Sequence, residues 1–144
     1  IYDNPANIFV GGFIGTPPMN FIQGKVDKGF FVGEGIKVAV PDSKVKILEA
    51  NKKLGEEVVL GIRPENIHDD KVVKDTYKDA IVKLKVDVAE LLGAETNIHA
   101  QIGDHTLTAK VSARTDIGIG DDIELAFDMN KVHFFCPETE LRLK

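Results

Sequence analysis

Short runs of β-forming residues, separated by glycine-containing turns at fairly regular intervals, constrain the fold of this chain more than any other feature. The clearest run covers residues 81–88, where apolar side chains largely alternate with Lys83, Lys85 and Asp87. A period of two places successive side chains on opposite faces of a strand, so that one face is buried and the other is solvated. Several such strands with glycine turns predict a closed or nearly closed barrel, or a sandwich.

The remaining elements follow from the same signals. Further strands are predicted over residues 20–26, 58–62, 97–102, 105–113, 123–127 and 132–135, with a hairpin over residues 30–40. Residues 68–78 are expected to form a loop and residues 90–96 a turn. We predict a mainly β fold in which the second half forms a five-stranded barrel of the OB type and the first half adds strands and a helix to the same sheet system.

Two short helices are predicted. Asn4-Pro5 resembles an N-cap followed by proline at the first helical position, which indicates a docking helix over residues 5–13 within an N-terminal junction and linker, residues 1–19. The main domain is then residues 20–144. Its helix begins at Pro41-Asp42 and runs for about a dozen residues, with Gly55 as the C′ residue and the lysines as a solvated face, Lys44 among them.

Composition places the chain among ordinary globular proteins, with 43% hydrophobic and 28% charged residues. Cys136 is the only cysteine, so no intramolecular disulfide forms, and a reducing compartment such as the cytoplasm is the natural expectation. The net charge of −5, with no Trp and two Tyr, argues against nucleic-acid binding. The chain starts with Ile1 rather than methionine, which suggests a fragment of a larger protein.

An apolar strand, residues 58–62, runs into the corner Arg63-Pro64-Glu65. Pro64 fixes its own φ and pushes Arg63 toward extended geometry, so normal strand pairing ends here. Arginine carries five donors in a rigid fork, which suits it to hold a loop, a carboxylate or a neighbouring subunit. This stretch is therefore either a β-bulge or corner with a surface ion pair, or part of an interface.

No motif in the sequence indicates a catalytic or ligand-binding chemistry. The phosphate-binding pattern GxxxxGK[ST] does not occur in the sequence, and the Gly118-x-Gly120 pair precedes Asp121-Asp122, whose charges repel phosphate. Only His99 and His105 could face each other across a hairpin, and two ligands are weak evidence for a metal site. No catalytic, cofactor-binding or metal-binding residue is predicted, and Cys136 is interpreted as a small hydrophobe.

Several motifs, taken in order, resemble a known family. Residues 1–7, 9–15 and 18–21 look like the junction that follows the ATPase core of sugar-importing ABC transporters. Residues 61–65 (Gly-Ile-Arg-Pro-Glu) are similar to a corner motif of the C-terminal domain of the maltose and multiple-sugar type, and residues 90–96 resemble its later signature turn. The ending at residues 132–135 also fits. The chain departs from the family at Cys136 and Glu140, where an acidic residue and a glycine are usual.

The resemblance implies a non-catalytic TOBE-type, OB-like regulatory domain that pairs with its copy in the ATPase dimer and receives regulatory proteins. ATP and magnesium would bind in the missing preceding domain, which would also contact the membrane subunits at the inner face of the cell membrane. A small-ligand module that binds oxyanions, with Arg63 as the candidate, is the alternative. The candidate contact residues are Arg63, Glu65, Glu90, Glu95, Gly120 and Phe135.

Overall fold

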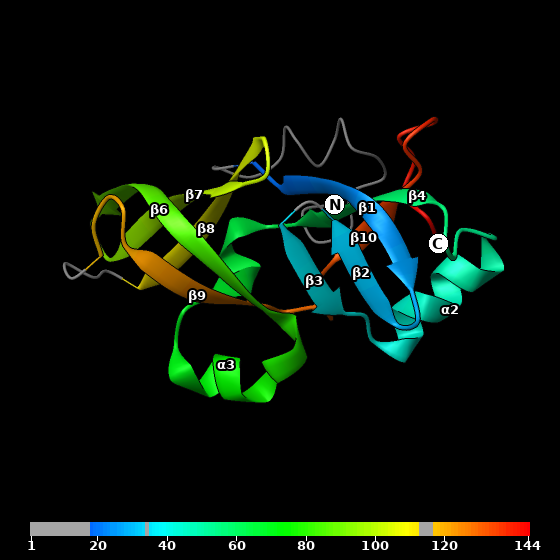
Figure 1. Ribbon diagram of the computed structural model, residues 1–144, viewed down its shortest axis with the longest axis horizontal. Helices are drawn as coiled ribbons and strands as arrows, with labels where there is room; N and C mark the ends of the chain where they lie inside the picture. The colour runs from blue at the N-terminus through cyan, green and yellow to red at the C-terminus, as the bar shows by residue number, and fades with distance from the viewer. Residues whose placement is uncertain (1–17, 34, 113–116) are drawn as a thin grey trace.

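The computed structural model describes residues 18–33, 35–112 and 117–144, and the predicted helix over residues 5–13 lies outside them (Figure 1). The described residues form two five-stranded antiparallel sheets. The first sheet has the order β10-β4-β1-β2-β3 and lies beside helix α2 (Asp42–Ala50). Its strands are β1 (Asn20–Asp27), β2 (Phe30–Gly33), β3 (Ile36–Ala39), β4 (Glu57–Ile62) and β10 (His133–Phe135).

The second sheet has the order β5-β9-β6-β7-β8, and β5 also lies against β8, so the sheet forms a nearly closed barrel. Its strands are β5 (Ile67–His68), β6 (Ile81–Leu92), β7 (Glu95–Ile102), β8 (His105–Ser112) and β9 (Asp122–Phe127). Three short helical segments lie on the path from β4 to β6, namely η1 (Pro64–Asn66), α3 (Lys71–Thr76) and η2 (Lys78–Ala80). The predicted mainly β, OB-like fold is confirmed.

One continuous core joins the two sheets. Buried side chains of the first sheet, including Phe31, Val38 and Leu60, belong to the same apolar cluster as Ile98 and Phe127 of the second sheet. The strand pattern produces this arrangement because alternate side chains of each half-buried strand point inward. The described residues of the two sheets therefore share one apolar core.

Most of the first half forms a sheet of its own and does not extend the barrel sheet, contrary to the prediction. β10 lies near the end of the sequence and is the fifth strand of the first sheet. It pairs with β4 in a register that places His133 opposite Gly61 and Phe134 opposite Leu60. The first half contributes only the two-residue strand β5 to the barrel. Local patterning could not reveal these pairings because they join segments far apart in the sequence.

The loop predicted over residues 68–78 was also wrong, since it contains α3, a helix with no buried residue and therefore no apolar period. Helix α2 is shorter than predicted. It ends at Ala50, where the Asn51 side chain donates to the Ile47 carbonyl at 2.7 Å, and Lys52 rather than Gly55 takes the first left-handed conformation, with φ 57°. The turn predicted over residues 90–96 is shorter in the structure. It consists of Gly93 and Ala94, between the end of β6 and the start of β7.

A second, smaller apolar cluster contains Met19, Val59 and Phe135, with Phe21 packed edge-on to Phe135 at 5.7 Å between ring centroids. Gly61 lies directly beneath it. A Cβ at this position would come within 2.7 Å of both the Met19 sulfur and the Phe135 ring, closer than real Cβ atoms approach. The glycine of the Gly-Ile-Arg-Pro-Glu motif is therefore required by packing.

Candidate functional site

The Arg63 corner is a 3-10 turn rather than a β-bulge. Arg63 is extended, at φ −78° and ψ 148°, and Pro64 begins η1. The Asn66 N–H donates to the Arg63 carbonyl at 2.9 Å, and the Asn66 carbonyl accepts the N–H of Asp128 at 2.9 Å. Arg63 is 3% exposed and is therefore not a surface side chain, whereas Glu65 is half-buried.

Arg63 lines a hollow of about 310 Å³, which we call the corner hollow. A second hollow of about 360 Å³, the C-terminal hollow, lies next to it and shares Lys44 and His133 with it. The corner hollow is lined by Met19, Lys44, Arg63, Asn66, Asn130, Lys131 and His133. The C-terminal hollow is lined by Lys44, Ile47, Val132, His133, Phe134, Arg142, Leu143 and Lys144.

The polar lining of both hollows is basic or neutral. Neither lining contains an aspartate or a glutamate among the described residues. Lys44 and Lys131 form no ion pair within residues 18–33, 35–112 and 117–144. Burial lowers the pKa of the half-buried Lys44 ammonium below its usual value, and the positive charge of Arg142 lowers it further. The two hollows are therefore a region of positive potential in a chain of net charge −5.

The prediction that Lys44 lies on a solvated face of its helix was wrong. Lys44 lies four residues before the fully buried Leu48, so it faces the side of α2 that turns toward the body of the protein. That spacing was a signal in the sequence. Lys131 and His133 were not predicted as site residues, because only the pairing of β10 with β4 brings them to the Arg63 corner.

Glu90 and Glu95 lie at the exposed end of the β6–β7 hairpin, not in a long turn. Their neighbours include three apolar side chains with large exposed fractions, Val88 at 45%, Leu91 at 56% and Leu92 at 55%. We call these five residues the hairpin tip. The register places Val88 and Leu92 on the same face of the hairpin as Glu90 and Glu95, and Leu91 on the opposite face.

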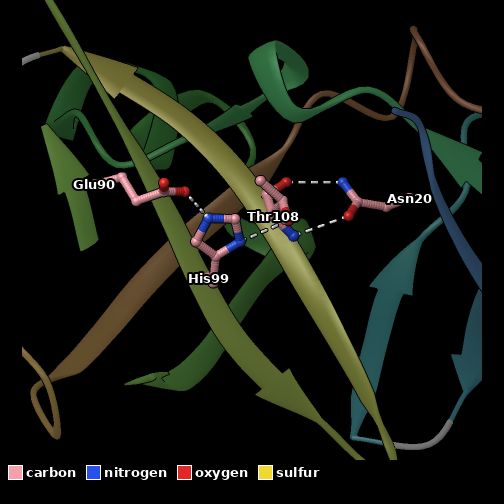
Figure 2. A network of polar contacts seen from close by, with 4 residues as sticks. All are labelled: Asn20, Glu90, His99 and Thr108. Atoms are coloured by element: carbon pink, nitrogen blue, oxygen red, sulfur yellow. Dashed lines mark hydrogen bonds and ion pairs between the residues drawn. The ribbon is translucent and has the colours of Figure 1, made fainter. Parts of the chain in front are cut away.

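A polar network connects the first sheet to the barrel (Figure 2). The Asn20 amide donates to the Thr108 carbonyl at 2.8 Å and accepts the Thr108 N–H at 2.8 Å. His99 contacts the Thr108 hydroxyl through Nδ1 at 3.1 Å and the Glu90 carboxylate through Nε2 at 2.5 Å. The candidate residue Glu90 is thus linked, through His99 and Thr108, to the strand that begins the first sheet.

Gly120 and Phe135 occupy ordinary structural positions. Gly120 lies in an exposed turn at φ +87°, where its N–H donates to the Val86 carbonyl. Phe135 has no exposed surface and belongs to the core.

The turn that contains Gly120 does not fit the phosphates of ATP. The Gly118 N–H that could hold a phosphate donates instead to the Asp121 carboxylate at 2.8 Å. His99 and His105 do not face each other, since the register places His99 opposite Thr108 and His105 opposite Ile102. No metal-binding group of three His, Cys, Asp or Glu side chains occurs in the part of the chain that the structure describes.

Comparison with protein families defines the class. The model of the MalK OB fold domain matches residues 15–67, and the model of the TOBE domain matches residues 79–134. The chain is therefore an OB and TOBE domain unit and not an ATPase domain. It belongs to the family of such domains found in the ATP-binding proteins of sugar-importing ABC transporters.

Individual relatives support this assignment along the whole chain. The oligosaccharides import ATP-binding protein MsmX of Bacillus subtilis is 47% identical over 144 residues, covering 100% of this chain and 40% of the relative. The multiple sugar-binding transport ATP-binding protein MsmK of Streptococcus mutans is 39% identical, covering 100% of this chain and 38% of the relative. The chain thus spans well under half the length of these relatives.

Among solved structures, the cytoplasmic molybdate-binding protein ModG, with molybdate bound, superposes with a TM-score of 0.63. The match covers 82% of this chain and 96% of ModG at 15% identity, which shows a shared fold. None of the helices in the described residues is long and apolar enough to cross a membrane.

Proposed function

We propose that the chain is the non-catalytic regulatory and dimerisation domain of the ATP-binding subunit of a carbohydrate ABC importer. The observation that carries the proposal is the 47% identity, along the whole chain, with an oligosaccharide-import ATP-binding protein. The parent protein would be an ATPase, peripheral at the inner face of the cell membrane, with ATP and magnesium held in the domain that precedes this one. Its partners would be the membrane subunits, a second copy of itself and a regulatory protein.

The described residues support a contact role rather than a catalytic one. The hairpin tip presents apolar side chains rimmed by Glu90 and Glu95, the composition of a small protein contact site. Glu90 is held by His99, so its carboxylate keeps a defined position at this surface. The contact candidates that keep exposed or partly exposed side chains are thus Glu65, Glu90 and Glu95.

A chimera tests the regulatory role. The segment of the Bacillus subtilis relative that aligns with this chain is replaced by residues 1–144, and a second version lacks the segment. We expect the chimera to support growth on oligosaccharides, and the shortened version to lose either uptake or its regulation. Unchanged uptake and regulation in the shortened version would refute the proposal, as would ATP hydrolysis by the isolated chain.

Dimerisation through the hairpin tip has its own test. Leu91→Glu places a charge at one exposed apolar side chain of the hairpin tip, whereas Leu141→Glu places the same charge at a leucine that is 55% exposed elsewhere. Sedimentation of the chimera with ATP should show weaker pairing for Leu91→Glu and unchanged pairing for Leu141→Glu. Equal pairing in both variants would remove the hairpin tip from the dimer contact.

Binding of a small oxyanion is a second candidate function. The specific observation in its favour is the corner hollow, where Arg63 lies together with two lysines and His133. Arginine and lysine side chains form short, charge-assisted hydrogen bonds with oxyanions. Calorimetry with molybdate, sulfate and inorganic phosphate tests this function, and a flat trace with all three would argue against it.

A further inference from the structure

The corner hollow and the C-terminal hollow together collect basic side chains from four separate segments. Lys44 comes from α2, Arg63 from the corner after β4, Lys131 and His133 from the region of β10, and Arg142 and Lys144 from the segment after it. Like charges at close range repel one another, and the repulsion is stronger where the site is partly shielded from water. Arg63, His133 and Arg142 also interact within the chain, but the mutual repulsion of the cluster opposes folding, and a ligand of opposite charge would offset it.

The charged form of Lys44 is destabilised by this clustering of basic side chains. It is half-buried, and burial and Arg142 both disfavour its charged form, as the lowered pKa records. A neighbouring acidic side chain would relieve this cost, but the linings of both hollows contain none. A bound anion would supply the missing negative charge.

The lining also indicates which kind of anion fits. Arg63, Lys44 and Lys131 line the corner hollow, and Asn66 and Asn130 add neutral polar groups. Arg63 also interacts within the chain, but its guanidinium has five donors and can serve both roles. A phosphate group carries a charge of about −1.5 to −2 at neutral pH and three acceptor oxygens, which matches several cations better than a single carboxylate does.

The C-terminal hollow differs in character from the corner hollow. Four apolar residues, Ile47, Val132, Phe134 and Leu143, form half of its lining, beside Arg142 and Lys144. A bare inorganic anion would leave this apolar surface unused. A molecule with a charged head and an organic body would use both hollows, with its body against the apolar lining.

We propose that the two hollows together bind the phosphate monoester of a small organic molecule, with Arg63, Lys44 and Lys131 around the phosphate and Ile47 and Leu143 against the organic part. The inference rests on the second candidate function above, because it specifies the ligand class of that oxyanion site. It does not depend on the regulatory role, although a ligand that fixes α2 against β10 would provide a means of regulation.

Titration calorimetry on the whole chain tests the inference, with glucose 6-phosphate and phenyl phosphate as organic probes, inorganic phosphate and molybdate as bare anions, and glucose as the uncharged control. At least one ester should bind about 10-fold more tightly than inorganic phosphate, and glucose should not bind. If the bare anions bind as tightly as both esters, the ligand class is refuted while the oxyanion function stands. If no anion binds, both are refuted, and the chimera experiment still decides the regulatory role.

Variants locate the site. Lys44→Gln and Lys131→Gln should each weaken ester binding by about 10-fold, because each removes one charge-assisted contact. Lys46→Gln is the matched control, since Lys46 is exposed on the same helix and lines neither hollow. Urea unfolding of each variant verifies that it is folded. An equal loss of affinity in all three variants would mean a diffuse electrostatic effect and would overturn the site.

Discussion

Replacing Asn20 by alanine should destabilise the protein far more than the size of the side chain suggests. Asn20 lies at the start of β1, is 8% exposed, and makes three hydrogen bonds through its amide. Two of them join Thr108 of β8, the edge strand of the barrel, and the third reaches the Ile62 carbonyl of β4 at 3.2 Å. The change therefore separates the first sheet from the barrel at one point.

The magnitude follows from these contacts. Each hydrogen bond contributes about 0.5–1.5 kcal/mol net, and a buried group left without a partner costs about 1–3 kcal/mol. Three lost bonds, with the partly buried Thr108 N–H and carbonyl left behind, give an expected loss of about 2–4 kcal/mol in the free energy of unfolding. Urea unfolding of the isolated chain, followed by circular dichroism, measures this quantity.

Asn97→Ala is the matched control. Asn97 is the same residue type, is 7% exposed and also lies in a strand, but its Oδ1 has no hydrogen-bond partner among the described residues. Asn97→Ala should lower the free energy of unfolding by less than about 1 kcal/mol. The native state is already destabilised by the unsatisfied acceptor, so removing the side chain loses no hydrogen bond. Equal losses for Asn20→Ala and Asn97→Ala would refute the argument that the bridge to Thr108 sets the difference.

Three further predictions concern packing and charge. Gly61→Ala should lower the free energy of unfolding by about 1–3 kcal/mol, since the added methyl group meets two side chains at 2.7 Å, and an unchanged urea midpoint would contradict this. Phe134→Ala should cost about 3–5 kcal/mol because Phe134 is 2% exposed, whereas Val32→Ala at 47% exposure should cost under about 1 kcal/mol, and similar midpoints would contradict the burial argument. The lowered pKa of Lys44 means that the unfolded chain binds more protons between that pKa and the usual lysine value, so the free energy of unfolding should rise with pH in this window. Lys44→Gln should remove that rise and be more stable than the natural chain at neutral pH, and a less stable variant there would contradict the sign.

The sequence predicted those parts of the fold that depend on neighbouring residues. The alternation along β6 and the proline at the Arg63 corner identified a strand and its end, because both signals lie within a few residues. The pairing of β10 with β4 left no such signal, since it depends on which strand edge remains available once β1 has paired. The basic hollows were missed for the same reason, as Lys131 reaches Arg63 only through that pairing. Helix α3 was missed because no side chain of it is buried.

The position of β10 also determines when the protein can fold during its synthesis. The match to the TOBE model extends to residue 134, yet β10 completes the sheet built by the residues of the MalK OB model. Until β10 has left the ribosome, β4 presents an unpaired edge, and such edges are prone to pair with other chains. Of the two sheets, the first is thus begun earlier and completed later, so slow translation of the residues between β4 and β10 would lengthen the period in which the nascent chain is exposed to aggregation.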